Sequence, residues 1–244
     1  MISQSFIFAA GRGERMRPLT DTIPKPLVKI KDKAIIDYSI EKLSKISAVQ
    51  KIVVNGFYLA DEIEGHLKNL CNPKIIFSRE VEKIETGGGL AYALENKIVD
   101  SNLPILLVNG DVLWEDVAGI SDIEEICEAY SANDCDIMLG LKKNGEVLGY
   151  EGQGDFLFDA KSLALYKKDD VARSHVFVGT QVVHPRIFLG VSEKCFSMNY
   201  FYKKALNASG LLEGVKGFEL KGKYFHIGDV ASIALVEGAL KSDI

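Results

Sequence analysis

Short apolar runs recur along this chain and restrict it to a sheet-containing fold. The runs have strand-like length, are rich in Val, Ile and Phe, and lie at residues 5–10, 51–56, 74–78, 104–110, 136–141 and 175–183. Their near-continuous apolar character predicts strands that are buried on both faces. Between the first four runs lie helical patterns at 35–47, 59–70 and 88–97. Alternation of strand and helix predicts a parallel sheet with helices on both faces.

The second half of the chain follows a different pattern. Residues 142–170 contain glycine-punctuated short segments with rough alternation, which predicts hairpins. Two helices are expected at about 199–209 and 230–242, with a strand pair near 215–227 between them. No linker composition separates two domains. We therefore predict a single α/β domain over residues 1–244, with a small β-rich addition on its C-terminal side.

Composition and charge restrict the class of protein and its partners. With 47% hydrophobic and 26% charged residues, the chain has the balance of a globular protein with a sizeable core, which excludes a disordered chain. Its 29 basic and 34 acidic residues give a net charge of −5, which disfavours nucleic acid as a partner. The sequence shows no signal-peptide pattern, membrane-length apolar run or C-x-x-C pair. We expect a cytoplasmic protein that binds no membrane.

The segment after the first apolar run combines prolines, glycines and positive charge. Residues 8–31, FAAGRGERMRPLTDTIPKPLVKIK, hold three of the six prolines, which predicts a stiff loop. Six basic and two acidic side chains make this segment positive within a negative chain. Ligands of open α/β sheets bind beyond the carboxyl ends of the strands, where this loop begins. The patch therefore indicates a small polyanionic ligand, with a solvated basic loop as the alternative.

Individual residues of this loop suit phosphate binding. Gly11 and Gly13 lack Cβ, so backbone N–H groups can approach phosphate oxygens closely. Arg15 offers a planar fork of donors and Lys25 a compact charge. The spacing does not fit a dinucleotide fingerprint, because Met16 stands where the third glycine is needed, and no Walker motif occurs.

The same residues carry a resemblance to a known family. The loop resembles the signature of the sugar-1-phosphate nucleotidyltransferases through Gly11-x-Gly13-x-Arg15-Met16-x-Pro18-x-Thr20 and Pro24-Lys25-Pro26-Leu27. Similar motifs continue at ETGGG (85–89), LLVNGDV (106–112), GDF (154–156), GTQVVHP (179–185), FSMN (196–199) and FHIGD (225–229). Within the family, the chain is most similar to the branch of N-acetylmuramate-1-phosphate uridylyltransferases and mannose-1-phosphate guanylyltransferases.

This resemblance implies a fold, an activity and a set of site residues. The fold is Rossmann-like (GT-A type), with a mixed, mostly parallel sheet, a nucleotide-binding part at about 1–112 and a sugar-phosphate-binding part at about 113–244. Family members join a nucleoside triphosphate to a sugar 1-phosphate and release pyrophosphate. The catalytic residues implied are Arg15 and Lys25. The nucleotide-binding residues implied are Ala9, Ala10, Gly11, Gly13, Gly87 and Gly88, of which the last two lie in a loop. The sugar-phosphate-binding residues implied are Gly154, Asp155 and Asn199.

A metal site is expected at Asp111, which follows the apolar run PILLVNG. Mg²⁺ prefers oxygen ligands and is commonly held by one or two carboxylates together with substrate phosphates. The resemblance identifies Asp111 as the metal-binding acid, but His226 stands where the family often has a second aspartate. Three alternatives remain: His226 contacts metal or phosphate, Asp229 substitutes, or Asp111, water and phosphates suffice. We favour the last, because imidazole suits Mg²⁺ poorly.

The expected reaction joins UTP to N-acetylmuramate 1-phosphate. The alternatives are GTP with mannose 1-phosphate and a non-catalytic nucleotide-sugar sensor on the same fold. A related glycosyltransferase is disfavoured, because Val112 and Leu113 follow Asp111 where an aspartate-x-aspartate motif would continue. The family's glutamate-lysine-proline motif for the sugar phosphate is absent, so the group that neutralises this phosphate is unassigned. The chain is expected to act as a monomer or homodimer.

Overall fold

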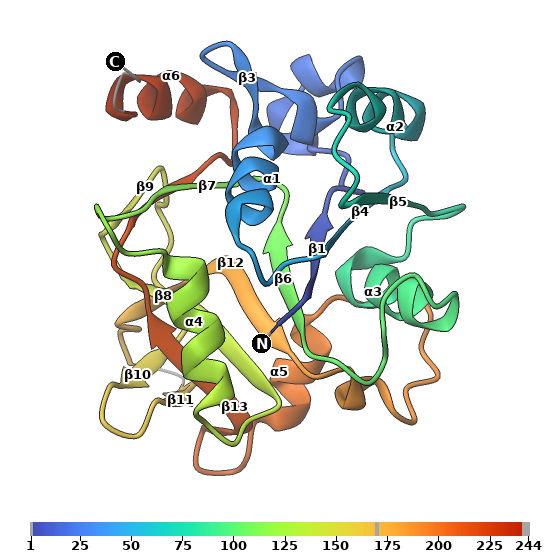
Figure 1. Ribbon diagram of the computed structural model, residues 1–244. Coiled ribbons are helices and arrows are strands. Elements are labelled where there is room, and N and C mark those ends of the chain that lie inside the picture. The colour runs from blue at the N-terminus through green and yellow to red at the C-terminus, as the bar shows by residue number, and fades with distance from the viewer. Residues whose placement is uncertain (1, 169–170, 241–244) are drawn as a thin grey trace.

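A nine-stranded mixed sheet forms the centre of the molecule (Figure 1). The computed structural model describes residues 2–168 and 171–240. The strands of this sheet are β1 (Gln4–Phe8), β4 (Lys51–Gly56), β5 (Ile75–Arg79), β6 (Ile105–Asn109), β8 (Ile137–Lys143), β10 (Leu157–Asp159), β11 (Ala164–Tyr166), β12 (His175–Val183) and β13 (Leu211–Glu219). Their order across the sheet is β10-β11-β13-β8-β12-β6-β1-β4-β5. The apolar runs predicted as strands are confirmed as β1, β4, β5, β6, β8 and β12.

The N-terminal part of the sheet is parallel. β1 lies between β6 and β4, and β5 follows β4, all in the same direction. β12 then pairs antiparallel with both β6 and β8, so the C-terminal strands continue the same sheet. The predicted mixed α/β fold is confirmed, and most of its β-rich C-terminal side is joined edge to edge with the parallel part.

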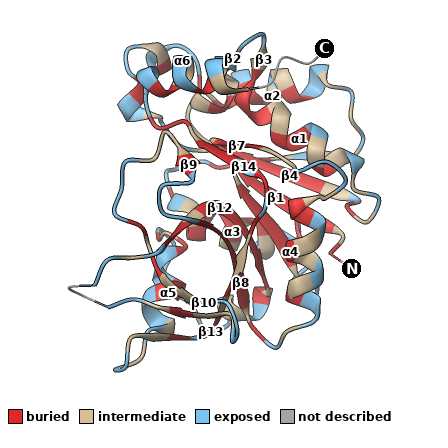
Figure 2. Ribbon diagram, turned by 90° about the vertical axis from the view of Figure 1, so that its left-hand side faces the viewer, coloured by how far each residue is buried: buried red, intermediate tan, exposed pale blue. Residues whose placement is uncertain are grey.

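Helices cover both faces of the sheet. They are α1 (Ile35–Lys45), α2 (Ala60–Asn69), α3 (Glu85–Glu95), α4 (Asp122–Ser131) and α5 (Asn199–Ala205), whereas α6 (Val230–Ala239) packs against the loop after β1. α1, α2 and α4 pack on the face that contains Ile7, whereas α3 and α5 pack on the face that contains Phe6 and Phe8. All residues of β1 are therefore buried, as Figure 2 shows for the central strands. Residues 241 and 242, expected at the end of the last helix, lie outside the described residues.

A three-stranded sheet lies beside the large one. It contains β7 (Val112–Glu115), β14 (Lys223–His226) and β9 (Val147–Leu148), in the order β7-β14-β9. The predicted strand pair near 215–227 is therefore wrong, because β13 belongs to the large sheet and β14 to the small one. The Asp122 carboxylate accepts hydrogen bonds from the backbone N–H groups of Lys221 and Gly222, at 2.9 Å each. These bonds fix the chain between β13 and β14 on α4, away from a hairpin.

The hairpins predicted within 142–170 are confirmed in part, and the loop predicted after β1 is confirmed. Within 142–170, β10 and β11 form the expected hairpin, but β9 pairs in parallel with β14. The loop after β1 has no long helix, as predicted, and contains 3₁₀ turns at Glu14–Met16, Leu19–Asp21 and Lys25–Leu27. It ends in the two-stranded hairpin β2 (Lys29–Ile30) and β3 (Lys33–Ala34). No helix in the described part of the chain is long and apolar enough to cross a membrane.

The glycine-rich segment is helical: α3 confirms the helix predicted at 88–97 but begins already at Glu85, which corrects the expectation that Gly87 and Gly88 lie in a loop. Both residues lie in the first turns of α3 and are buried. A Cβ on Gly87 would lie 2.4 Å from the Phe196 ring, and a Cβ on Gly88 would lie 2.3 Å from the carbonyl oxygen of Lys194. Residues 194–196 can therefore pack closely on α3 only if glycine occupies these two positions. The packing compensates for the low helix propensity of glycine.

We predict that Gly88→Ala lowers the free energy of unfolding by about 1–3 kcal/mol, because the added methyl group overlaps a backbone carbonyl. Gly65→Ala is the matched control, since Gly65 lies in the exposed middle of α2 with no atom within 4 Å of the added Cβ. Gly65→Ala should raise the stability by about 0.5–1 kcal/mol through helix propensity. Urea unfolding of both variants measures the difference. Equal effects of the two substitutions would contradict the packing role of Gly88.

Candidate active site

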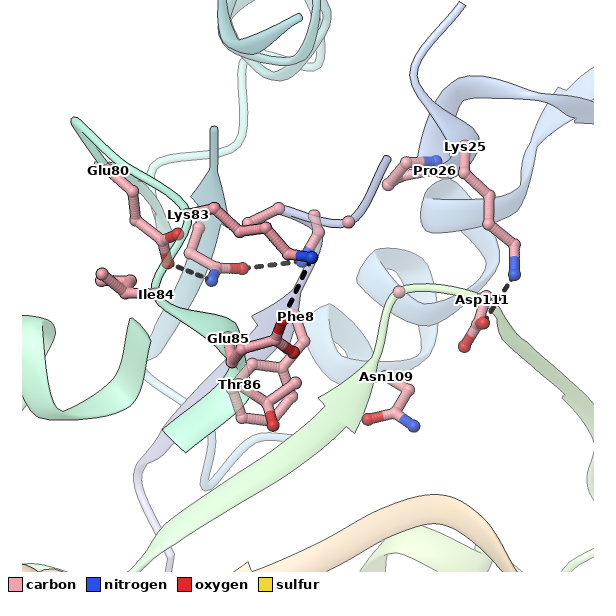
Figure 3. A pocket seen from close by; sticks show the side chains of 15 residues that line it. Phe8, Lys25, Pro26, Glu80, Lys83, Ile84, Glu85, Thr86, Asn109 and Asp111 are labelled. Carbon is pink, nitrogen blue, oxygen red and sulfur yellow. Dashed lines mark hydrogen bonds and ion pairs between the residues drawn. The ribbon is translucent and has the colours of Figure 1, made fainter. Parts of the chain in front are cut away.

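A cavity of about 220 Å³ opens beyond the carboxyl ends of β1, β4 and β6 (Figure 3). The loop after β1, the turn after β6 and the start of α3 form its walls. The residues that line it are Phe8, Ala9, Ala10, Gly11, Lys25, Pro26, Asn55, Glu80, Lys83, Ile84, Glu85, Thr86, Asn109, Gly110 and Asp111. The structure thus brings Ala9, Ala10, Gly11, Lys25 and Asp111 of the sequence prediction to one cavity.

Lys25 and Asp111 form an ion pair at one end of this cavity. The Lys25 Nζ atom lies 2.7 Å from Asp111 Oδ2, and the two side chains are 12% and 30% exposed. Lys25 is held between Pro24 and Pro26 in a 3₁₀ turn. The turn after β6, which carries Asp111, is fixed by a hydrogen bond from Gly110 N to the carbonyl oxygen of Phe8. Partial burial strengthens the field of such charges toward a bound anion.

A second cavity of about 120 Å³ shares Asn109 and Asp111 with the first. Its other walls come from the C-terminal half of the chain and from β7. The residues that line it are Asn109, Asp111, Val112, Val147, Tyr150, Val176, Phe177, Val178, Gly179, Tyr224, Phe225 and His226. Ligands in the two cavities would therefore meet at Asp111.

Arg15 and His226 lie near this junction. A Cβ built on Gly228 would be 2.9 Å from His226 Nε2 and 3.3 Å from the Arg15 guanidinium, so Gly228 lets both side chains approach. Burial lowers the pKa of His226, and the positive charges of Lys25 and Arg15 lower it further against the opposing effect of Asp111. His226 is thus neutral at pH 7, with its imidazole available as a hydrogen-bond donor.

Asp229 has a structural partner. Its Oδ1 accepts a hydrogen bond from Ser232 N at 2.9 Å and caps α6, and this bond lowers the pKa of Asp229. Among the described residues, no group of three or more His, Cys, Asp or Glu side chains could hold a metal ion. The protein therefore offers Asp111 as a carboxylate at the junction, and the role of either His226 or Asp229 toward a metal stays a prediction.

Several predicted site residues do not line either cavity. Gly13 has a φ of +64° and packs behind Lys25, since a Cβ there would lie 2.9 Å from Lys25 Cβ. Gly154 and Asp155 fix the start of β12: Asp155 Oδ2 accepts a hydrogen bond from Phe177 N at 2.9 Å. Asn199 is exposed at the start of α5. Contact of these residues, and of Gly87 and Gly88, with a substrate stays a prediction.

The sequence analysis did not identify Asn55 and Glu80, two buried polar residues of the first cavity. Asn55 ends the apolar part of β4, and Glu80 directly follows β5. Asn55 Oδ1 accepts a hydrogen bond from Ala9 N at 2.7 Å, and Asn55 Nδ2 donates to Glu80 Oε1 at 2.5 Å. Burial raises the pKa of Glu80 to about 7. The available signal was a polar side chain at the carboxyl end of each of the two parallel strands that follow β1 in the sheet, β4 and β5. Thr86, Asn109 and Tyr150 were also not assigned a role.

Comparison with known proteins agrees with this geometry. The profile of the family described as Nucleotidyl transferase matches residues 4–150. An N-acetylmuramate alpha-1-phosphate uridylyltransferase of Caulobacter vibrioides is 34% identical over 97% of this chain and 96% of its own length. A mannose-1-phosphate guanylyltransferase catalytic subunit beta of Danio rerio is 34% identical over 46% of this chain and 31% of its own.

A solved structure extends the comparison to the whole fold. The crystal structure of HddC from Yersinia pseudotuberculosis complexed with GMP-PN is 23% identical, with a TM-score of 0.75 over 99% of this chain and 100% of that one. The sequence matches show that the chain belongs to the nucleotidyl transferase family. It is a sugar-1-phosphate nucleotidyltransferase, with a nucleoside triphosphate and a sugar 1-phosphate as its substrates.

We predict that Lys25→Ala slows turnover by roughly 10²–10³-fold, because loss of one charged donor at a phosphoryl centre costs about 2.7–4 kcal/mol of barrier. Lys29→Ala is the control, since Lys29 is an exposed lysine of the following strand β2 and lines neither cavity. Pyrophosphate release under saturating substrates measures both rates. A Lys25→Ala enzyme as active as the Lys29→Ala enzyme would remove Lys25 from the chemistry.

Proposed function

We propose that this enzyme joins UTP to N-acetylmuramate 1-phosphate and releases pyrophosphate. The observation that carries the proposal is the position of Lys25 and Asp111 where two cavities meet. Residues 8–111 line the first cavity, which we assign to the nucleotide, and residues 109–226 line the second, which we assign to the sugar phosphate. Similarity to the Caulobacter vibrioides uridylyltransferase along nearly the whole chain supports this choice of substrates.

The reaction requires the protein to bring two anions together. An oxygen of the sugar 1-phosphate attacks the α-phosphorus of the triphosphate, and pyrophosphate leaves with the electron pair of the broken bond. The attacking oxygen is already ionised at neutral pH, so no general base is required. Lys25 lies beside both reacting groups in this arrangement and offsets their repulsion. Arg15, near the junction of the two cavities, supplies a second cation, which we assign to the leaving phosphates.

The residues present fit Mg²⁺ as the cofactor. Asp111 offers a partly exposed carboxylate at the junction, and Mg²⁺ is commonly held by one or two carboxylates with substrate phosphates. When bound, the ion would polarise the α-phosphoryl group and neutralise developing charge. Asp111 would hold it, and Lys25, now paired with Asp111, would then be released toward phosphate oxygens. Neutral His226 would donate a hydrogen bond to a phosphate or to water.

GTP with mannose 1-phosphate is the second candidate. It is supported by the similarity of the N-terminal half to the Danio rerio guanylyltransferase subunit and by the fold shared with HddC, which was crystallised with GMP-PN. A non-catalytic sensor is a weaker alternative, because Arg15, Lys25 and Asp111 are all present and the last two are in contact.

We expect pyrophosphate release to be fastest with UTP and N-acetylmuramate 1-phosphate. The measurement is a matrix of four nucleoside triphosphates against N-acetylmuramate 1-phosphate, N-acetylglucosamine 1-phosphate, mannose 1-phosphate and glucose 1-phosphate, with Mg²⁺. The fastest pair should exceed any pair with another base by roughly tenfold or more, since each good bidentate base contact contributes about 1–3 kcal/mol. Fastest release with GTP and mannose 1-phosphate would instead establish the second candidate.

Substitution of Asp111 and His226 separates the alternatives for the metal. Asp111→Ala should nearly abolish turnover, because the carboxylate at the junction is lost, whereas His226→Ala should reduce turnover and leave residual activity. The comparison is made by pyrophosphate release at increasing Mg²⁺ concentrations, with both folds checked by thermal unfolding. Negligible losses in both variants would overturn the assignment of the metal to Asp111.

A further inference from the structure

An exposed leucine projects between two hollows on the side of the molecule that carries α3 and α5 (Figure 1). Leu189 directly follows the 3₁₀ helix Pro185–Phe188 and is 79% exposed. The α3 hollow lies between α3 and residues 184–194 and has a volume of about 590 Å³. The β13 hollow lies between α5 and the start of β13 and has a volume of about 270 Å³. Leu189 and Arg186 line both hollows and separate them.

We propose that this face binds a second copy of the chain in a two-fold symmetric homodimer, with Leu189 of each copy inserted into the α3 hollow of the other. A two-fold contact uses the same patch on both subunits, so one patch must carry both the projection and the hollow that receives it. Leu189 and the α3 hollow meet this condition, because Leu189 stands at the edge of the hollow. Assembly through this face is independent of which substrates the enzyme uses.

The segment that carries Leu189 is held in place before any partner binds. His184 Nδ1 accepts a hydrogen bond from Arg186 N at 3.1 Å and caps the 3₁₀ helix. Leu189 N donates to the carbonyl oxygen of Arg186 at 3.1 Å. The Phe188 ring packs against the ring of Phe201 in α5, with 4.8 Å between the centroids. A preformed projection loses little conformational freedom on binding, which favours association.

The α3 hollow offers apolar walls to a leucine side chain. Ala91 and Leu94 line it from α3, and Phe188 and Val191 line it from the segment 184–194. Since an apolar cavity of about 150 Å³ can hold a benzene molecule, the α3 hollow has room for a leucine side chain. Docking of two copies would therefore remove both exposed leucines from water, which drives association.

Exposed charges of both signs surround this apolar centre. Glu95, Glu193 and Lys194 border the α3 hollow. Lys204 and Glu213 border the β13 hollow. None of these five side chains forms an ion pair with another residue in the described part of the chain. A patch of mixed sign can pair with its own copy, whereas a patch of one sign would repel it, so the charges favour a second copy as the partner.

The patch is large enough for a stable interface. A standard protein–protein interface takes about 20–30 residues from each side. The walls of the α3 hollow and the β13 hollow together contain a comparable number of residues, which come from α3, α5, β13 and the segment between β12 and α5. None of these residues lines either active-site cavity, so the proposed interface is separate from the site of catalysis.

Analytical ultracentrifugation of the wild-type chain at about 1–100 µM tests the proposal, since interfaces of standard size have dissociation constants that range from micromolar to picomolar. We expect a dimer at the upper end of this range. Leu189→Asp should raise the dissociation constant of the dimer by roughly 100-fold or more, because one carboxylate from each copy would enter an apolar hollow. A wild-type chain that stays monomeric at about 100 µM would overturn the proposal.

Val81→Asp is the matched control for Leu189→Asp. Val81 is 82% exposed and lies outside both hollows, so the same substitution is made at an equally exposed apolar residue. The Val81→Asp chain should dimerise as the wild type does. Loss of the dimer in both variants, or in neither, would contradict the role of Leu189. Thermal unfolding checks that both variants are folded.

Amide hydrogen exchange of the wild-type chain locates the interface without any substitution. The backbone N–H groups of residues 189–194 should exchange more slowly at about 100 µM than at about 1 µM, because the partner covers them in the dimer. Slower exchange confined to another surface would show that the copies associate elsewhere, which is incompatible with the proposal. If Leu189→Asp does not fold, ultracentrifugation and hydrogen exchange of the wild type decide together.

Discussion

The contact between Lys25 and Asp111 is the interaction on which the arrangement of the site depends. The two residues are far apart in the sequence and come together only because β1 and β6 are adjacent parallel strands whose carboxyl ends meet at one edge. The loop after one strand supplies the cation, and the turn after the other supplies the acid. Met16, Val28 and Ile30 anchor the loop that carries Lys25, because they pack in one core cluster with Leu113 of β7 and Val236 of α6.

Close backbone packing is the second constraint, and it explains residues that have no chemistry of their own. The glycines of α3 let residues 194–196 and the Glu80–Asn55 pair approach the helix to distances that no side chain would permit. Gly228 does the same for Arg15 and His226. The glycines of α3 and Gly228 thus serve to bring other groups close, which is a different role from that of a flexible phosphate loop.

The central strands and the stiff loop after β1 could be predicted from the sequence because their signals are local. Apolar runs of strand length and a proline-rich basic loop can be recognised in one sequence without a structure. The elements that the sequence analysis misplaced depend on contacts between segments that are distant in the sequence. The hydrogen bonds of Asp122 with the chain after β13 place β14 in another sheet. α4 itself was missed although Ser121 caps it and Ile123, Ile126 and Tyr130 are buried with helical spacing.

The site shows the same division. Lys25 and Asp111 were identified by motif, but the pairing of Asn55 with Glu80 requires β4 and β5 to be neighbours and α3 to close over them. The burial that shifts the pKa of Glu80 arises only when the whole chain is folded. No local pattern in the sequence reports it.

The small sheet has a mechanical effect on the site. Asp111 immediately precedes β7, and His226 ends β14, whose register pairs His226 with Val112. The ladder of backbone hydrogen bonds between these strands fixes the two walls of the second cavity to each other as a single rigid piece. A ligand that needs more room in the second cavity would therefore displace the Tyr150 segment, since spreading Asp111 and His226 apart would break that ladder.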